Sequence, residues 1–296
     1  MIALITAISL QAWTAHSEIY FWTGFYKQKE FKFNGLDNKM IYITGDVHSK
    51  IRNYFEQKIA GSELKAAIIF LKILRKYKLS STLFVNGKCL DENPEEVKNL
   101  LEFDVELGGH TYNNFGNLGI IRKYLNKKIY GCIYGSAFYQ RKDVKKTKRA
   151  FEKLGLEMKS WRTHAFGSNK KTLRILRQNE VKYVSDLLGE TKPFVESGII
   201  HMPVNIPVDQ NSIAYSILRP ENRNPFIGCK EARIKPEEWF EILKKRVEKN
   251  EKDKVPSIIL IHPITMAVLD NFRLFEKIAR FLSKYKSGKI SELIIK

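Results

Sequence analysis

Side chains that can take part in hydrolysis recur in this chain directly after short apolar segments. They are Asp46 and His48, His110, Arg162, Asp186 and His262. Carboxylates and imidazoles exchange protons with substrates, imidazoles also bind divalent metal ions, and a guanidinium group stabilises a neighbouring carboxylate. Such groups acting together could activate a water molecule and protonate a leaving group. The residue types therefore favour a hydrolytic site.

The apolar segments that precede these residues have the composition of buried strands. They are Met40 to Thr44, Val105 to Leu107, Met158 to Trp161, Lys182 to Ser185 and Ser257 to Ile261. Further strands are predicted over Ser81 to Val85 and Ile199 to Val204. In a β/α fold the carboxyl ends of parallel strands share one face. Residues that are far apart in the sequence can therefore meet there.

Helices are predicted between these strands because apolar residues recur at helical spacing. One ends near residue 78, one begins at Pro94 behind Asn93 as its cap, and others cover 142–153, 170–179, 236–249 and 271–284. Residues 291–296 are predicted to form a final strand. The alternation indicates an α/β fold, which we predict to be a distorted or incomplete (β/α) barrel of about seven parallel strands.

Two connections interrupt this alternation, over residues 113–138 and 205–233. The second is rich in Pro, Asn and Arg and is long for a connection between elements. We expect it to fold over the site, with Asn205 or Asp209 facing the substrate cleft. Because these two segments match no motif, the sequence leaves the identity of the substrate open.

The chain has 296 residues, and its hydrophobic fraction of 44% is enough for a sizeable core. We predict a catalytic domain over residues 40–296 and an N-terminal appendage over residues 1–39, which are aromatic and charged without a clear period. The first fourteen residues are apolar, but no Lys or Arg precedes them and they are too short to span a bilayer as a helix. No transmembrane segment is predicted, and export is unsupported.

The chain carries 51 Lys and Arg against 32 Asp and Glu, a formal net charge of +19 that would suit an anionic partner. The lysines are scattered along helical segments among acids, as on solvated faces, so no nucleic-acid partner is predicted. Cys89, Cys132 and Cys229 are far apart and odd in number, which argues against a disulfide framework or a structural zinc site. This favours a reducing, cytoplasmic compartment without excluding export. The oligomeric state is not determined.

Four strings in the sequence resemble, in order, the motifs of the polysaccharide deacetylase superfamily (NodB-like, carbohydrate esterase 4). They are ITGDVH, ELGGHTYNN, SWRTHAFGSNKKTLRILRQNEVKYVSD and IILIHP. The resemblance covers roughly Met40 to the C-terminus. It implies a metal-dependent hydrolase of non-peptide C–N bonds that removes N-acetyl groups from an amino-sugar glycan or glycolipid. A carbohydrate is thus the implied substrate, and a divalent metal ion, zinc by preference, the implied cofactor.

The resemblance also implies roles for four residues in proton transfer. Asp46 corresponds to the catalytic base and Arg162 to the arginine that pairs with it. His262 corresponds to the general acid that protonates the leaving amine, and Asp186 to the acid that orients this histidine. A carboxylate partner raises the pKa of an imidazole, which would keep the acid protonated near neutral pH.

The metal ligands implied by the resemblance are His48, His110 and Asn114, and two of them depart from the family pattern. His48 stands where the family has a carboxylate, and Asn114 stands where it has its second histidine. An imidazole suits a zinc-like ion, but an amide oxygen is a poorer ligand for a transition metal. His164 could compensate; it is left out of the predicted set because family members carry a Pro-containing turn there.

Each of these residues also has an ordinary structural explanation. An Asp can cap a turn, a His can sit in a polar pocket and an Arg can pair with a surface acid. The order of the motifs favours a joint site over these explanations. Two functions stay open: the metal-dependent deacetylase, or a metal-free amide hydrolase or non-catalytic glycan- or polyanion-binding protein on the same fold.

Overall fold

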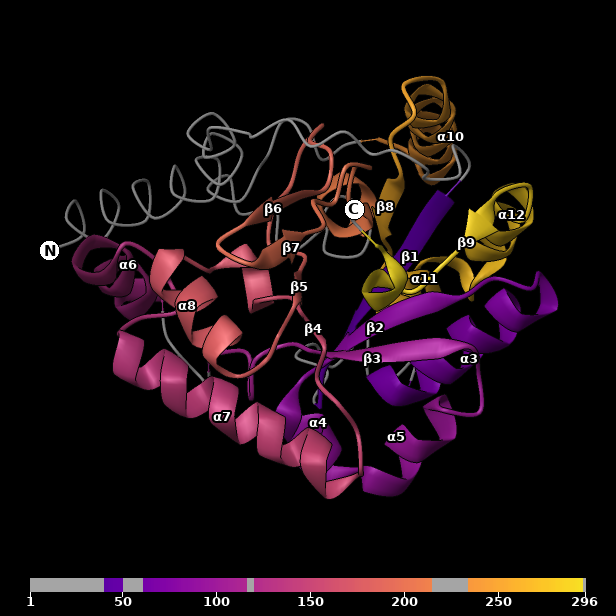
Figure 1. The fold of residues 1–296 in the computed structure, drawn as a ribbon. Coiled ribbons are helices and arrows are strands. Elements are labelled where there is room, and N and C mark those ends of the chain that lie inside the picture. Colours follow the sequence, from indigo (N-terminus) through magenta and orange to yellow (C-terminus); the bar gives the residue numbers. More distant parts are fainter. Residues whose placement is uncertain (1–39, 50–60, 116–119, 215–233, 295–296) are drawn as a thin grey trace, which may run out of the picture.

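The computed structural model describes residues 40–49, 61–115, 120–214 and 234–294 (Figure 1). Its strands are β1 (Met40–Val47), β2 (Ser81–Val85), β3 (Val105–Gly109), β4 (Ser160–Trp161), β5 (Tyr183–Val184), β6 (Phe194–Glu196), β7 (Ile199–His201), β8 (Ser257–Leu260) and β9 (Lys286–Ser287). Its α-helices are α3 (Glu63–Lys76), α4 (Gly87–Glu92), α5 (Pro94–Leu100), α6 (Ile120–Tyr130), α7 (Ala137–Lys153), α8 (Lys170–Gln178), α10 (Pro236–Lys252), α11 (Pro263–Asp270) and α12 (Arg273–Leu282). Shorter helical turns are η3 (His164–Phe166), η4 (Gln210–Ala214) and η6 (Ile290–Glu292).

The strands form one open sheet in the order β6-β7-β5-β4-β3-β2-β1-β8, and β9 pairs with the start of β1. All pairings are parallel except that of β6 with β7. Figure 1 shows the larger helices arranged around the outside of the strands. The predicted α/β fold with an incomplete barrel of parallel strands is thus confirmed.

The segment after β7 spans part of the open side of the sheet. Val204 forms a parallel bridge with Leu188, and the next residue, Asn205, reaches β8. The Asn205 backbone N–H donates to the carbonyl of Ile258, and its side-chain oxygen accepts from the Ile258 N–H at 2.9 Å. Asn205 therefore satisfies the backbone N–H and carbonyl of Ile258 in β8 as a neighbouring strand would. From there the chain continues toward residue 209.

Alternation of side chains along β1 decides which residues face the site. Ile41 and Ile43 pack in the hydrophobic cluster that also contains helix residues, whereas Tyr42 packs in a second cluster with Ile258 and Leu260 of β8. Because successive side chains point to opposite faces of a strand, Thr44 and Asp46 share the face of Tyr42. Asp46 is thus directed away from the helices, to the concave side of the sheet.

Gly108 and Gly109 of the ELGGH string lie in β3, where the absence of a side chain leaves room for the side chains of the neighbouring strand β4. A Cβ atom on Gly108 would lie 2.4 Å from the Ser160 hydroxyl, and one on Gly109 would lie 2.5 Å from the Trp161 ring. Both glycines have ordinary strand conformations, so close packing of β3 on β4 is the reason for them.

Several predicted elements differ from those in the structure. Helices α4, α6 and α11 were not predicted: residues 120–130 lie in a stretch that was interpreted as irregular, and residues 87–92 and 263–270 were assigned to no element. The predicted final strand is wrong over residues 291–294, and the strand near this end is β9. The proposed appendage, residues 1–39, lies outside the described residues, as do Cys229 and most of the long connection.

Most of the longer helices in the described part have one apolar, buried side and one polar, exposed side. Helix α8 begins with a reciprocal cap in which the Asn169 side chain accepts from the Thr172 N–H and the Thr172 hydroxyl accepts from the Asn169 N–H. Its apolar residues Leu173, Ile175 and Leu176 are buried. Among the helices described, none has the length and apolar character needed to cross a membrane.

Candidate active site

The structure brings together most of the residues that the sequence singled out. Asp46 near the end of β1 and Arg162 after β4 form an ion pair, with the Arg162 Nη1 donating to Asp46 Oδ1 at 2.9 Å. The other oxygen, Asp46 Oδ2, lies 3.7 Å from His110 Nε2 and 3.7 Å from His262 Nε2. The carboxyl ends of β1, β3, β4 and β8 therefore converge on one carboxylate.

Arg162 is fully buried, and its guanidinium is held on several sides. Its Nη2 donates to the hydroxyls of Thr44 and Ser185, and its Nε donates to the backbone carbonyl of Ser185. The guanidinium carbon also lies 4.3 Å from the centre of the Phe84 ring. We call Asp46, Arg162, Thr44 and Ser185 the carboxylate network. Its hydrogen bonds fix the orientation of Asp46 Oδ1.

The charges around Asp46 keep its carboxylate ionised. Burial alone would raise the pKa of Asp46, but its electrostatic interactions with His110, Arg162 and His262 outweigh burial and hold this pKa well below its usual range. Arg162 carries its charge at every relevant pH. Asp46 is therefore an anion that can accept a proton from water at Oδ2.

His262, which follows β8, is held by Asp209. The His262 Nδ1 lies 2.7 Å from Asp209 Oδ1, and its backbone N–H donates to Asp209 Oδ2 at 2.8 Å. Burial would lower the pKa of His262, but Asp209 and Asp46 outweigh it and raise this pKa above its ordinary value. The imidazole therefore tends to keep its proton, with Nε2 directed toward Asp46.

Asp186 does not make the contact that we predicted for it. Its carboxylate accepts from the Thr163 backbone N–H and from the Thr163 hydroxyl, the latter at 2.6 Å. It supports the turn after Arg162, while Asp209 is the acid hydrogen-bonded to His262. The correction has a physical reason: the segment that Asn205 ties to β8 brings residue 209 to the end of that strand, whereas Asp186 follows β5.

Three histidines form a second group beside the carboxylate network. Nitrogen atoms of His48, His110 and His164 all lie within 4.8 Å of one another. The His110 Nε2 and His164 Nδ1 are 3.3 Å apart, and the ring centres of His48 and His110 are 5.1 Å apart. We call these three residues the imidazole cluster. They come from the ends of β1 and β3 and from η3.

Two residues of the imidazole cluster have fixed tautomers. His110 Nδ1 lies 2.8 Å from the Arg162 carbonyl, and His48 Nδ1 lies 2.8 Å from Glu63 Oε2. These oxygens accept hydrogen bonds, so both imidazoles carry a proton on Nδ1 and direct Nε2 elsewhere. Burial lowers the pKa of His110 to about 3, which keeps its Nε2 lone pair available at neutral pH.

The imidazole cluster fits a divalent metal ion. His48 Nε2 is buried and has no hydrogen-bond partner among the described residues. Neutral imidazoles are preferred zinc ligands, and two nitrogens on one tetrahedral zinc stand about 3.3 Å apart, as those of His110 and His164 do. Glu63 behind His48 is the carboxylate partner typical of metal-binding histidines.

Asn114 lies close to this group but makes a different contact. Its side-chain oxygen accepts from Asn86 Nδ2 at 3.1 Å, and the Asn86 oxygen in turn accepts from the Ser49 N–H. This chain of amides connects the loop after β3 with the residue that follows His48. A role of Asn114 as a ligand stays a prediction.

The backbone around the imidazole cluster is strained. Positive φ angles occur at Thr111, Asn114 and Phe115 after β3, and at Ala165 and Phe166 after His164. A β-branched residue such as Thr111 rarely adopts φ near 59°. Such conformations cost roughly 1–3 kcal/mol each and concentrate at functional sites. Their grouping beside His110 and His164 supports a functional origin for the cluster.

Three residues of this site were missed or left out by the sequence reasoning. His164 was weighed and omitted, Asp209 was considered only as a cleft residue, and Glu63 was not considered. The available signal for His164 was its position two residues after Arg162, within the third motif string. Glu63 begins a helix beyond residues 50–60, and nothing local to it indicates a histidine partner.

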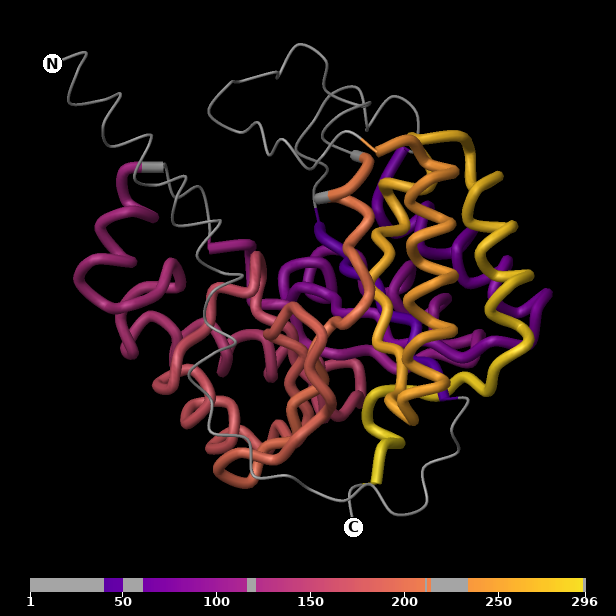
Figure 2. Tube along the Cα trace, turned by 90° about the horizontal axis from the view of Figure 1, so that it is seen from above, coloured from indigo at the N-terminus to yellow at the C-terminus, as the bar shows by residue number. Residues whose placement is uncertain are grey.

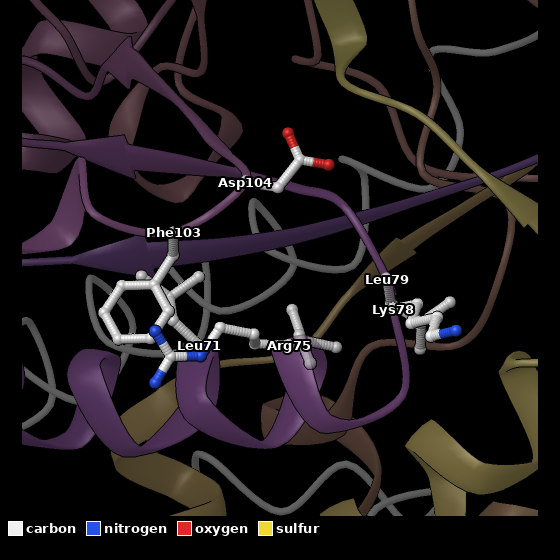
Figure 3. Close-up of a pocket in the computed structure, with 7 residues that line it drawn as sticks. Leu71, Arg75, Lys78, Leu79, Phe103 and Asp104 are labelled. Carbon is white, nitrogen blue, oxygen red and sulfur yellow. The ribbon is translucent and has the colours of Figure 1, made fainter.

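A pocket of about 290 Å³ lies elsewhere, between the end of α3 and the turn before β3 (Figure 3). Its lining includes Arg75, Lys78, Phe103 and Asp104. Lys78 precedes β2 and Asp104 precedes β3, so this pocket is at the amino ends of the strands. It is separate from the candidate site, which lies at their carboxyl ends.

The topology defines the class of the protein as an incomplete β/α barrel with its polar groups at the carboxyl ends of the strands. The model of the polysaccharide deacetylase family matches residues 36–184, and this chain belongs to that family. The resemblance noted from the motifs is thereby confirmed. No curated protein matches the chain in sequence.

Solved structures with a similar fold share little sequence with this chain. A protein from Mycobacterium smegmatis described as a polysaccharide deacetylase has 15% identity and a TM-score of 0.61, over 86% of this chain and 88% of that chain. An allantoinase has 12% identity and a TM-score of 0.60, over 90% and 92%. A variant of a carbohydrate esterase family 4 pseudoenzyme from Bacillus anthracis, with restored activity, has 16% identity and a TM-score of 0.50, over 86% and 67%. These similarities concern the fold alone.

Proposed function

We propose that this chain is a metal-dependent hydrolase that removes N-acetyl groups from an amino-sugar glycan or glycolipid. The observation that carries the proposal is the position of the imidazole cluster beside the Asp46 carboxylate, with His110 Nε2 3.7 Å from Asp46 Oδ2. Family membership supports the reaction class, because amide hydrolysis needs an activated water, stabilisation of an oxyanion and a proton for nitrogen.

His48, His110 and His164 would hold the metal ion. An ion bound there would polarise the acetyl carbonyl and lower the pKa of a bound water. Zinc is the ion that a set of three imidazoles favours. The proposed set differs from the one expected from the sequence in that His164 replaces Asn114.

Two groups that face each other carry out the proton transfers in this proposal, one as the base and the other as the acid. Asp46 Oδ2 removes a proton from the attacking water, while the bond from Arg162 to Oδ1 keeps the carboxylate in place. His262, kept protonated by Asp209, donates its Nε2 proton to the leaving nitrogen. The 3.7 Å between Asp46 Oδ2 and His262 Nε2 lets both act on one scissile amide.

Elemental analysis of the purified chain tests the metal site. We expect about one equivalent of zinc, lost in His48→Ala, His110→Ala and His164→Ala, because a structural or catalytic zinc needs at least three protein ligands. Asn114→Ala is the matched variant, and we expect it to retain the metal. Loss in Asn114→Ala with retention in His164→Ala would instead support the ligand set inferred from the sequence.

Release of acetate from N-acetylglucosamine oligomers tests the reaction. The zinc-loaded chain should release acetate, and zinc removal should stop the release. A chain that binds no metal even after reconstitution would contradict the proposal and favour the metal-free or non-catalytic alternative. Metal binding without acetate release would contradict the substrate class.

A further inference from the structure

Helix α6 presents an apolar stripe to solvent. Ile121, Leu125 and Ile129 are spaced by four residues, which places them along one side of the helix. Their exposed fractions are 57%, 47% and 66%, and Phe138 at the start of α7 is 75% exposed. Isolated exposed apolar residues are ordinary, but a continuous stripe on one helix indicates a binding surface. Figures 1 and 2 show α6 at the edge of the molecule.

Basic residues border this stripe. Helix α6 contains Arg122, Lys123, Lys127 and Lys128 and no acidic residue. With about 3.6 residues per turn, Arg122 and Lys128 fall on the two edges of the stripe. Both are exposed. An apolar stripe with cationic edges is the pattern of a helix that lies in the interface of an anionic membrane.

The location of α6 connects this surface with the candidate active site. The helix is inserted between β3 and α7, the helix that returns the chain to β4, so it lies on the side of the carboxyl ends of the strands. The turn after α6 reaches the imidazole cluster through Phe115, which precedes the helix: the Phe115 ring lies 5.0 Å from Tyr134 of this turn and 5.5 Å from His164, centre to centre. A surface bound to α6 would therefore lie at the same end of the sheet as the cluster.

We propose that α6 and the start of α7 dock on an anionic lipid bilayer. Two other occupants fit the charge less well. A second copy would bring the cations of two α6 helices together. Residues 1–39 of this chain carry four lysines against three acids, so this segment offers no net negative charge. A bilayer with anionic headgroups supplies both an apolar layer for the stripe and negative charge for its edges.

Docking goes beyond the proposed function and does not depend on it. One consequence for the substrate does rest on the proposed function: a deacetylase held at a bilayer would act on amino sugars carried by lipids. Vesicle binding and acetate release are separate measurements, so either idea can fail alone. An Asp46→Asn chain, expected to be inactive, should bind vesicles as the unaltered chain does.

Sedimentation of the full chain with vesicles tests the docking. We expect binding to vesicles of phosphatidylcholine and phosphatidylglycerol in equal parts, and weak binding to phosphatidylcholine alone. Leu125→Glu combined with Ile129→Glu should reduce binding at least about tenfold, since charged groups on the stripe oppose insertion. Ile69→Glu on α3, at a site 42% exposed, is the matched control and should leave binding unchanged.

A second pair of variants tests the charged edges. Each cation near an anionic surface strengthens binding roughly fivefold, so Arg122→Glu with Lys128→Glu should lower binding more than tenfold. Lys245→Glu with Lys252→Glu, exposed on α10, should change it much less. Equal losses in both pairs would point to net charge alone and overturn the proposal. Retained binding in the stripe variant would also overturn it, as would a dimer of the full chain that this variant dissociates.

Discussion

The carboxylate network and the imidazole cluster lie side by side, but their polar atoms are satisfied differently. Arg162 donates to Asp46, Thr44 and Ser185, and it has no exposed surface. In the imidazole cluster, by contrast, His48 Nε2 is buried without a hydrogen-bond partner in the described part of the chain. Burying such an atom costs free energy that a bound ion would recover.

This difference indicates how the two groups divide the chemistry. In the carboxylate network the Arg162 guanidinium is bonded to Asp46, Thr44 and Ser185, so it can hold a base in one position before substrate binds. In the imidazole cluster one buried nitrogen, His48 Nε2, has no hydrogen-bond partner among the described residues, and nitrogen atoms of the three histidines lie within 4.8 Å of one another. Four predictions test the contrast, in order of decreasing effect.

Asp46→Asn should have the largest effect. Loss of a general base lowers turnover by about 10²–10⁴-fold, and we expect the upper part of this range because Asp46 Oδ2 is the carboxylate oxygen that faces His262. Zinc content should be unchanged, because Asp46 lies outside the proposed ligand set. Steady-state kinetics with elemental analysis measures both. Loss of zinc from the Asp46→Asn variant would place Asp46 among the ligands.

Arg162→Met should cost about 3–5 kcal/mol in the free energy of unfolding, since it leaves the Asp46 charge buried without its partner. Arg177→Met, which removes an exposed arginine that bonds to the Ser197 carbonyl, is the control and should cost far less. Urea denaturation measures both. Adding Asp46→Asn to Arg162→Met should restore part of the stability, and a purely additive loss would show that the two groups are not coupled.

Glu63→Gln should lower zinc affinity by about 10–100-fold, because the carboxylate holds the His48 ring in one orientation through a 2.8 Å hydrogen bond. Glu96→Gln, on the exposed face of α5, is the control and should leave the affinity unchanged. Competition with a chelator gives both constants. Unfolding of the metal-free protein should change little, which separates a positioning role from a structural one. Equal affinities would remove Glu63 from the site.

Asp209→Asn should have the smallest effect and should shift the pH profile of turnover. In the unaltered chain, activity requires an ionised Asp46 and a protonated His262, so it is lost as pH rises through the raised pKa of His262. Without the Asp209 charge, burial lowers that pKa, and the alkaline limb should move to lower pH. The same change at Asp186 should leave this limb in place. If the alkaline limb moved only in the Asp186→Asn variant, Asp186 would be the acid that orients His262, as inferred from the sequence.

The sequence predicted well where local patterns carry the information. Residues 40–44 and 257–261 were predicted to be buried strands. The first range lies within β1, and all but the last residue of the second lies in β8, which pairs in parallel with β1. The order of the four strings was enough to identify the family. Helix α6 was missed although Ile121, Leu125 and Ile129 recur at helical spacing, because it lies in a Gly- and Asn-rich stretch that was interpreted as irregular.

Pairings across the site were harder to predict because they depend on how the ends of the strands are brought together. Asp186 and Asp209 are both acids at the ends of segments, and no local feature shows which of them reaches His262. His48 and Glu63 are separated by residues that carry no motif, so their contact requires the packed fold.

The amino-acid sequence was sufficient to predict the family, the parallel strands and the residue types of the site, because these follow from composition, periodicity and motif order. The contact of Asp209 with His262, and the grouping of His164 with His48 and His110, became visible in the folded chain alone. The reason is geometric: hydrogen-bond partners and metal ligands must lie within a few ångströms, and the crossing of chain segments, such as the one that Asn205 ties to β8, sets those distances.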